Sequence, residues 1–145
     1  MPDYTFPVQL ELRLDWSELD LFGHINNVSY FKYLQASRLN YWESLGLTNW
    51  FRDHGIGPIL ASTRCDFRKP LNYPGNISVR VSVSEMRTTS FSLYHQIIDD
   101  AGDLAAEGHD VVVLFDYRKS EKYAIPDDLR RQVEAAENRR FTTEN

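Results

Sequence analysis

The chain has 145 residues, 42% hydrophobic and 26% charged, an ordinary globular composition that suits one domain with a single core. Its formal net charge is -5 and its basic residues are scattered, which argues against a broad nucleic-acid surface. The single cysteine, Cys65, excludes an internal disulfide framework and a cysteine-based metal site, so we expect a small buried thiol there.

The N-terminal segment, MPDYTFPVQL, has no basic stretch followed by an apolar run, as a signal peptide would. No apolar run approaches the ~20 residues that span a bilayer, so we expect a cytoplasmic protein without a membrane partner. The segment VQLELRLDW then alternates strictly between apolar and polar residues, which predicts a half-buried strand. Its apolar face consists of Val8, Leu10, Leu12, Leu14 and Trp16.

A long helix is predicted over about Val28 to Leu45. It follows the polar segment SELDLFGHINN, in which Asn26 or Asn27 can cap the helix start. Apolar residues cover well over half of the helix circumference, so we expect burial on most sides. Gly46 offers a C-terminal stop.

Four strand-like segments follow the helix. They are Ile59 to Lys69, ended by Pro70, then NISVRVSVSEM, SFSLYHQII, and LAAEGHDVVVLFDY, which ends near Tyr117. The segments PLNYPG and DDAGD are turn material, and short turns between successive strands favour antiparallel pairing.

The last predicted element is a short helix in IPDDLRRQVEAAE. Pro126 suits the helix start, and Asp127 and Asp128 suit the first turn. Leu129 and Val133 form one apolar face of this helix. The terminal residues RRFTTEN are expected to fray.

This order of elements predicts an α+β protein of the hotdog class. A five-stranded antiparallel sheet would wrap around the long central helix, within a single domain over 1–145 whose core spans about 6–134. One such layer leaves a sheet edge and part of its concave mouth open, and a second copy would cover both. We therefore expect a homodimer or a dimer of dimers.

The polar segment before the long helix contains more polar and ionisable residues than a helix cap requires. The first N–H groups of a helix lack intrahelical partners and carry partial positive charge, so they can hold a developing oxyanion. Asp20 lies seven residues upstream, and Gly23 allows a tight turn or close approach of a ligand. A carboxylate beside an oxyanion hole suits acyl transfer. An aspartate at this position is most often a turn former or cap, and a single histidine such as His24 is more often structural.

The stretch W-S-E-L-D-L-F-G-H-I-N-N-V-S-Y-F-K-Y-L resembles the motif of the 4-hydroxybenzoyl-CoA thioesterase family of hotdog acyl-CoA thioesterases. That motif is roughly aromatic-x-D-x-D-x-x-G-H-[VI]-N-N-x-x-Y-x-x-Y. The similarity continues through ASRLNYW, STRCDFRKPLNYPGNISV, MRTTSFSLYHQI and VVVLFDYRKSEKYAIP, and so covers Val8 to about Gln132. The resemblance implies an enzyme that hydrolyses a CoA thioester to free acid and CoA.

The resemblance also implies three catalytic positions. Asp20 occupies the second position of the D-x-D pair and would act as nucleophile or general base. Asn27 matches the position whose backbone N–H forms the oxyanion hole, and His24 matches the histidine of the motif. Glu18 replaces the first aspartate. Phe22 stands where plant acyl-ACP thioesterases have an asparagine, so their three-residue mechanism is not intact here.

Substrate-binding positions are implied in the same way, with CoA held across a subunit interface and its phosphates near basic side chains. The candidates are Gly23, Val28, Gly57, Pro58, Ser62, Thr63, Arg87, Thr88, Thr89, Ser90, Arg118 and Lys119. Only Arg87 remains of the basic cluster in the family's prototype, and each cation is equally consistent with a solvated surface residue. The resemblance implies no metal and no cofactor, because CoA is part of the substrate.

Several alternatives stay open from the sequence. They are a non-catalytic acyl-CoA binder, a hotdog enoyl-CoA hydratase and an acyl-ACP thioesterase; the hydratase motif D-x-N-P-x-H is not matched, because its Asn-Pro pair is missing. The acyl group is open too, whether aromatic, short or long. The helix aromatics are candidates for shaping an acyl pocket, although the long helix is apolar in any case. These are Tyr30, Tyr33, Tyr41 and Trp42.

Overall fold

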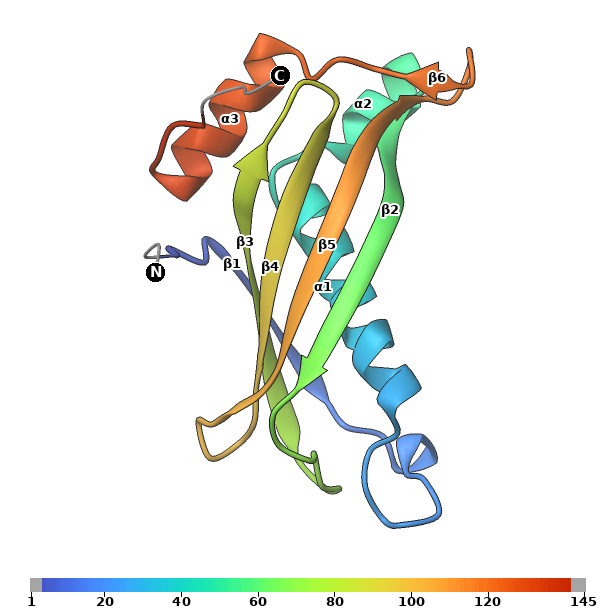
Figure 1. The fold of residues 1–145 in the computed structure, drawn as a ribbon, viewed down its shortest axis with the longest axis vertical. Coiled ribbons are helices and arrows are strands. Elements are labelled where there is room, and N and C mark those ends of the chain that lie inside the picture. The colour runs from blue at the N-terminus through green and yellow to red at the C-terminus, as the bar shows by residue number, and fades with distance from the viewer. Residues whose placement is uncertain (1–3, 142–145) are drawn as a thin grey trace.

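The computed structural model describes residues 4–141, in which one antiparallel sheet carries the long helix α1 along one face (Figure 1). The helices are α1 (Asn27–Ser44), α2 (Thr48–His54) and α3 (Asp127–Glu137), and a single 3-10 turn spans Trp16–Glu18. The strands are β1 (Val8–Arg13), β2 (Ile56–Phe67), β3 (Asn76–Met86), β4 (Ser90–Ile98), β5 (Leu104–Asp116) and β6 (Glu121–Lys122). In the part of the chain described, no helix is long and apolar enough to cross a membrane.

The sheet has the strand order β1-β3-β4-β5-β2, and β6 pairs with the end of β5. Every pairing is antiparallel, as the short turns predicted. The two-residue strand β6 was not expected, so the sheet has six strands where the sequence predicted five. The short strand β1 and the long strand β2 form the two edges, and the ladder between β2 and β5 shifts register between Leu60 and Ser62.

Helix α1 is buried along one face, because the sheet lies on one side of it. The buried residues recur at helical spacing and are Ser29, Tyr30, Tyr33, Leu34, Ser37, Tyr41 and Trp42. The expectation of burial on most sides is wrong for the single chain, since Val28 and Leu39 are exposed. The helix crosses close to β5, where a Cβ placed on Gly108 would lie 2.6 Å from Leu34 Cδ2. Glycine is required there by this close approach.

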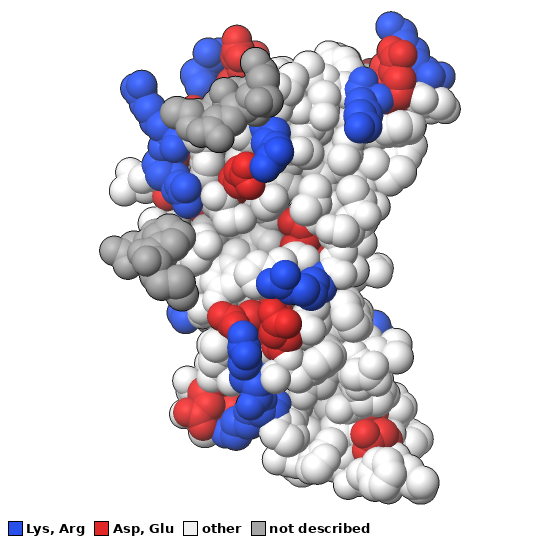
Figure 2. All heavy atoms as spheres, in the orientation of Figure 1, with Lys and Arg blue, Asp and Glu red and all other residues white. Residues whose placement is uncertain are grey.

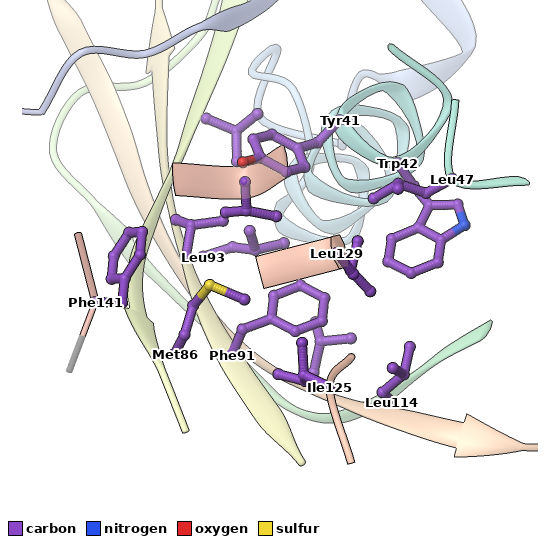
Figure 3. Close-up of a cluster of buried hydrophobic side chains, with 14 of the residues drawn as sticks. Tyr41, Trp42, Leu47, Met86, Phe91, Leu93, Leu114, Ile125, Leu129 and Phe141 are labelled. Atoms are coloured by element: carbon purple, nitrogen blue, oxygen red, sulfur yellow. The ribbon is translucent and has the colours of Figure 1, made fainter. Parts of the chain in front are cut away.

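The core has two clusters along α1, one toward each helix end. The first gathers side chains from α1, α3 and the sheet, and Figure 3 shows it with Leu129 of α3 between α1 and the strands. The carboxylate of Glu137 fastens α3 by accepting hydrogen bonds from Tyr41 Oη at 2.8 Å and Val83 N at 3.0 Å. Leu129 and Val133 are buried as predicted. Phe141 also packs in this cluster, so the expected fraying does not begin at Arg139; residues 142–145 lie outside the described part.

One further local expectation was wrong, and one helix was not predicted at all. Strand β1 ends at Arg13, and Trp16 starts the 3-10 turn with its ring exposed, so it does not share the apolar face of the strand. Helix α2 was not predicted because it is short and buries no residue, which leaves no periodic apolar pattern in TNWFRDH. It ends at Gly55, whose φ of 71° is the left-handed conformation typical of a helix end.

Candidate active-site loop at the start of α1

The loop from β1 to α1 is closed at its base by backbone bonds. Leu19 and Ile25 form an isolated antiparallel bridge. The carbonyl of Glu18 accepts hydrogen bonds from Asn26 N and from Asn26 Nδ2, both at 2.8 Å. Ile25 N donates to the carbonyl of Leu71 at 3.0 Å, which ties the loop to the segment after β2. Residues 20 to 24 therefore protrude from a fixed base.

Asp20 organises this protruding loop through one of its carboxylate oxygens. Oδ1 accepts hydrogen bonds from Phe22 N at 2.9 Å and His24 N at 3.2 Å. The backbone of the same residue pairs with His24 O at 2.7 Å and Gly23 N at 3.2 Å. Gly23 has φ +83°, which suits glycine in so tight a turn. Oδ2 accepts no hydrogen bond from residues 4–141, so Asp20 is a turn former that keeps one oxygen facing solvent.

The N-terminus of α1 follows directly and is capped on one side. Asn26 is the N-cap, and its Oδ1 accepts from Ser29 N at 2.9 Å. The N–H groups of Asn27 and Val28 precede the first intrahelical bonds, and both residues are exposed. The positive end of an 18-residue helix thus opens to solvent beside the Asp20 loop. An anion or a developing oxyanion suits this position.

Glu18 connects the loop to α1 and is a residue whose importance the sequence did not reveal. Its side chain is buried and accepts hydrogen bonds from Asp15 N at 3.0 Å, Tyr33 Oη at 2.8 Å and Lys32 Nζ at 3.3 Å. Burial acts to raise the pKa of Glu18, but these hydrogen bonds together hold the pKa below its ordinary value. Burial and the Glu18 hydrogen bond raise the pKa of Tyr33, which keeps that hydroxyl protonated. In the sequence, only the position of Glu18 as the first acidic residue of the motif pointed to it.

His24 lies on the same loop with an exposed side chain. Only its backbone contacts Asp20, through the bonds already described. The structure thus brings Asp20, Gly23, His24, Asn27 and Val28 together at one end of the molecule. Among residues 4–141, no group of three or more His, Cys, Asp or Glu side chains is placed to hold a metal ion.

The remaining predicted binding residues lie at the opposite end of the sheet or along β2 (Figure 1). Gly57 and Pro58 begin β2, and the hairpin between β3 and β4 contains Arg87, Thr88, Thr89 and Ser90. Arg118 and Lys119 follow β5 at that same end, and Ser62 and Thr63 lie midway along β2. Within one chain, the structure does not bring this group to the Asp20 loop.

The cations in the distant group differ in how far they are neutralised. Arg87 Nε lies 2.8 Å from Glu85 Oε1, so its charge is paired. Arg118 donates from Nη2 to the carbonyl of Asp53 at 3.4 Å, which leaves its charge without a carboxylate among the described residues. The carbonyls of Thr88 and Thr89 accept from Ile125 N and Leu114 N, so their backbone fastens the hairpin to neighbouring segments.

A groove of about 260 Å³ runs between the second half of α1 and the first half of β2. Most of its lining is apolar, with Arg38 and Gln35 as polar members. The lining residues are Gln35, Arg38, Leu39, Trp42, Pro58, Leu60 and Val112. Of the predicted binding residues, Pro58 alone contributes to it. The groove forms only because α1 and β2 lie side by side in the fold, and no local sequence pattern predicts that contact.

A second carboxylate cluster lies under α1 in the interior. His95 Nε2 donates to Asp110 Oδ2 at 2.6 Å, and Ser37 Oγ lies 2.8 Å from His95 Nδ1 in a hydrogen bond. Arg38 Nε donates to the same carboxylate at 2.9 Å, and Thr63 Oγ1 donates at 2.7 Å. Burial opposes ionisation of Asp110, but His95 and Arg38 lower its pKa to about 2. Thr63, predicted to bind substrate, is therefore tied to this buried network.

Comparison with known proteins identifies the family of this chain. Residues 14–133 match the family model of the thioesterase-like superfamily. The chain belongs to that superfamily. It is 20% identical over 128 residues to the long-chain acyl-CoA thioesterase FadM of Escherichia coli K12, an alignment that covers 88% of this chain and 97% of FadM. Thioester hydrolysis, the predicted class of reaction, is confirmed at the level of this family.

Solved structures support the same assignment of the fold. A thioesterase superfamily member from Jannaschia sp. CCS1 has a TM-score of 0.83 at 25% identity, with 92% of this chain and 85% of that chain covered. A gentisyl-coenzyme A thioesterase has a TM-score of 0.77 at 24% identity, with coverages of 87% and 99%. The curled antiparallel sheet with its helices is therefore a hotdog thioesterase fold.

Proposed function

We propose that the protein hydrolyses an acyl-CoA thioester, with Asp20 as nucleophile or general base and the start of α1 as oxyanion hole. The observation that carries this proposal is the carboxylate of Asp20. The loop backbone holds one of its oxygens and leaves the other unbonded among residues 4–141, on the loop that leads into the start of α1. A turn former needs only the first oxygen.

The chemistry follows from that placement. The thioester carbonyl oxygen would accept a hydrogen bond from Asn27 N, and the developing negative charge would be stabilised by about 3–4 kcal/mol. Asp20 Oδ2 would attack the carbonyl carbon and form an anhydride, or take a proton from the attacking water. In either route the C–S bond breaks, the CoA thiol leaves with a proton, and water supplies the second carboxylate oxygen. No metal or cofactor is needed for these steps.

The working unit is proposed to be a homodimer paired through β2. This strand is a long sheet edge whose Ile59 and Leu60 are exposed, and such edges readily pair with another strand. In Figure 2 few charged side chains cover the middle of the right-hand margin, along β2, below the charged cluster at the top right. A two-fold, self-complementary pairing through β2 would be antiparallel and would bury this edge in both copies.

Such pairing explains why the predicted residues lie at opposite ends of one chain. The far end of β2 touches the start of α1, where the rings of Tyr30 and Phe67 meet edge to face at 4.9 Å. Antiparallel pairing places that end beside the beginning of the partner's β2. The Asp20 loop of one copy would then face the groove at Pro58 and the Arg118 turn of the other. Arg118 and Lys119 would hold the phosphates of CoA.

The decisive test is thiol release from a panel of acyl-CoAs, followed with a thiol-reactive dye, for wild type and Asp20→Asn. An asparagine keeps the Oδ1 acceptor of the loop and removes only the charge and basicity. We expect kcat to fall by about 10²–10⁴-fold, the range for loss of a general base, with an unchanged melting temperature. Asp127→Asn changes an exposed aspartate at the start of α3, away from this loop, and serves as the control with normal turnover. Near-normal turnover in Asp20→Asn would refute the proposed mechanism.

The panel should run from acetyl to palmitoyl, include benzoyl and 4-hydroxybenzoyl, and add one acyl-carrier-protein thioester and crotonyl-CoA. Release from the carrier protein alone would identify an acyl-ACP thioesterase. Hydration of crotonyl-CoA without thiol release would identify a hydratase. Binding of a nonhydrolysable CoA analogue without either reaction would identify a non-catalytic binder.

A further inference from the structure

We propose that Trp42 forms the end wall of the acyl pocket and thereby sets the longest acyl chain that the enzyme accepts. The proposal rests on the function proposed above, because it takes the α1–β2 groove as the place where the acyl group lies. It adds the residue that limits the substrate and the class of substrate that a change at this residue would admit.

Two cavities meet at this one side chain. The open α1–β2 groove has Trp42 in its wall. An enclosed apolar pocket in the core beneath α3 has the same residue in its lining. The residues lining the enclosed pocket are Tyr41, Trp42, Leu47, Met86, Phe91, Ile125, Leu129 and Val133. Trp42 is the one residue common to both sets, so its indole separates the groove from the interior.

The indole is held firmly in this position. Trp42 is 7% exposed, and its ring lies parallel to that of Phe91 with 7° between the planes and 6.3 Å between the centroids. Phe91 pairs with Val112 across β4 and β5, and Val112 lines the groove on the other side. Figure 3 shows Trp42 at the margin of the core cluster, with Leu47 and Leu129 nearby. The wall is therefore a packed aromatic pair.

The space behind the wall suits an apolar chain. Its volume is about 10 Å³, so it holds at most about one water molecule while the indole is in place. Its lining is apolar apart from Tyr41, whose hydroxyl is already bonded to Glu137. A polar acyl terminus would find no partner there, whereas methylene groups would replace the atoms of the indole. Shortening Trp42 would join this space to the groove.

This arrangement predicts how rate depends on chain length. While the acyl chain lengthens within the groove, each added methylene group raises kcat/KM by about fourfold, the rate equivalent of about 0.8 kcal/mol. Once the chain reaches the indole, further methylene groups gain no buried contact, and kcat/KM stops rising. In a shortened Trp42 variant, the rise continues over several additional methylene groups.

The test is the profile of kcat/KM against saturated acyl-CoAs from butyryl to palmitoyl, for wild type, Trp42→Leu and Trp42→Ala. Leu47→Ala is the matched control, because Leu47 lines the enclosed pocket without touching the groove. It enlarges the interior behind an intact wall, so its profile should match the wild type. We expect both Trp42 variants to move the preferred chain to longer acyl groups, Trp42→Ala by more. The melting temperature of each variant shows that the measured enzyme is folded, and Trp42→Leu serves where Trp42→Ala does not fold.

The outcomes separate the two proposals. Wild-type turnover with the same chain-length profile in a folded Trp42 variant overturns the wall and leaves the proposed function standing. A shift as large in Leu47→Ala also overturns it, because the wall would then be irrelevant. No thiol release by the wild type on any substrate overturns the proposed function itself.

Discussion

Two carboxylates of this molecule lie near a histidine in opposite settings. Asp110 is 1% exposed and accepts hydrogen bonds from His95, Arg38 and Thr63, which occupy both of its oxygens. Asp20 is exposed and accepts two backbone N–H groups on one oxygen only. A buried carboxylate with both oxygens hydrogen-bonded to the protein stabilises the fold. Asp20, with one oxygen unbonded among residues 4–141 on the loop that leads into α1, is the carboxylate for which we propose a role in catalysis.

The two carboxylates also differ in the side chains that surround them. Arg38 and His95 keep Asp110 ionised in the interior, where an unpaired charge would be costly. The base of the Asp20 loop is held instead by hydrogen bonds of the buried Glu18 and the cap residue Asn26, neither of which is bonded to the Asp20 carboxylate. Stability and turnover should therefore respond separately to changes at the two sites.

The largest effect is expected from Asp110→Ala. Removing this carboxylate leaves His95 and Arg38 without their partner in the interior, and breaking such a pair costs about 3–5 kcal/mol of unfolding free energy. Asp20→Asn should change the unfolding free energy by less than about 0.5 kcal/mol, as exposed substitutions commonly do. Urea denaturation of both variants measures the contrast. Equal losses of stability in the two variants would show that the loop carboxylate is structural as well.

Glu18→Ala should fall between these extremes. It removes a charged acceptor of Asp15 N, Tyr33 Oη and Lys32 Nζ, a loss of about 1.5–3 kcal/mol. Because the same residue fixes the base of the Asp20 loop, kcat should fall together with stability. Urea denaturation and thiol release on one preparation measure both. Glu11→Ala, which removes an exposed strand carboxylate, is the control with little change in either.

Much of the fold could be predicted from local pattern. Strands β3 and β4 have the predicted bounds, since alternation and turn residues delimit them, and α1 begins one residue before the predicted start. Elements without an apolar period, α2 and β6, were missed. The one-sided burial of α1 also escaped prediction. A helix apolar on most sides does not reveal which side its own chain covers and which is left for a second copy.

The candidate site divides in the same way. Asp20, Gly23, His24 and Asn27 are close in sequence, so their proximity could be predicted. The buried network could not, although His95 stands at an inward position of an alternating strand and so carried a weak signal. Its contact with Asp110 depends on which strands are neighbours. The contact between Thr63 and Asp110 depends on the antiparallel register that places the two residues opposite each other across β2 and β5.

The pH dependence of stability should distinguish the buried carboxylate from the exposed one. The pKa of Asp110 is lowered from 3.8 to about 2, so folding favours its ionised form. Its contribution of about 2 kcal/mol is fully present above about pH 4 and is lost as the pH falls toward 2. The gap in unfolding free energy between wild type and Asp110→Asn, measured in urea, should therefore narrow over that interval. A gap of constant size from pH 5 to 2 would contradict the assignment.

The smallest expected effect comes from Asn26, where two substitutions separate capping from anchoring of the loop. Asn26→Asp keeps the acceptor for Ser29 N and places a negative charge at the helix start, but it loses the Nδ2 donor to the carbonyl of Glu18. Asn26→Ala loses both and should cost about 1 kcal/mol of unfolding free energy. Stability of the aspartate variant should stay near the wild type, while kcat falls by about two- to tenfold in both variants, the equivalent of one hydrogen bond. If kcat falls only in Asn26→Ala, the helix cap alone matters, and the second bond to Glu18 does not hold Asp20 in place.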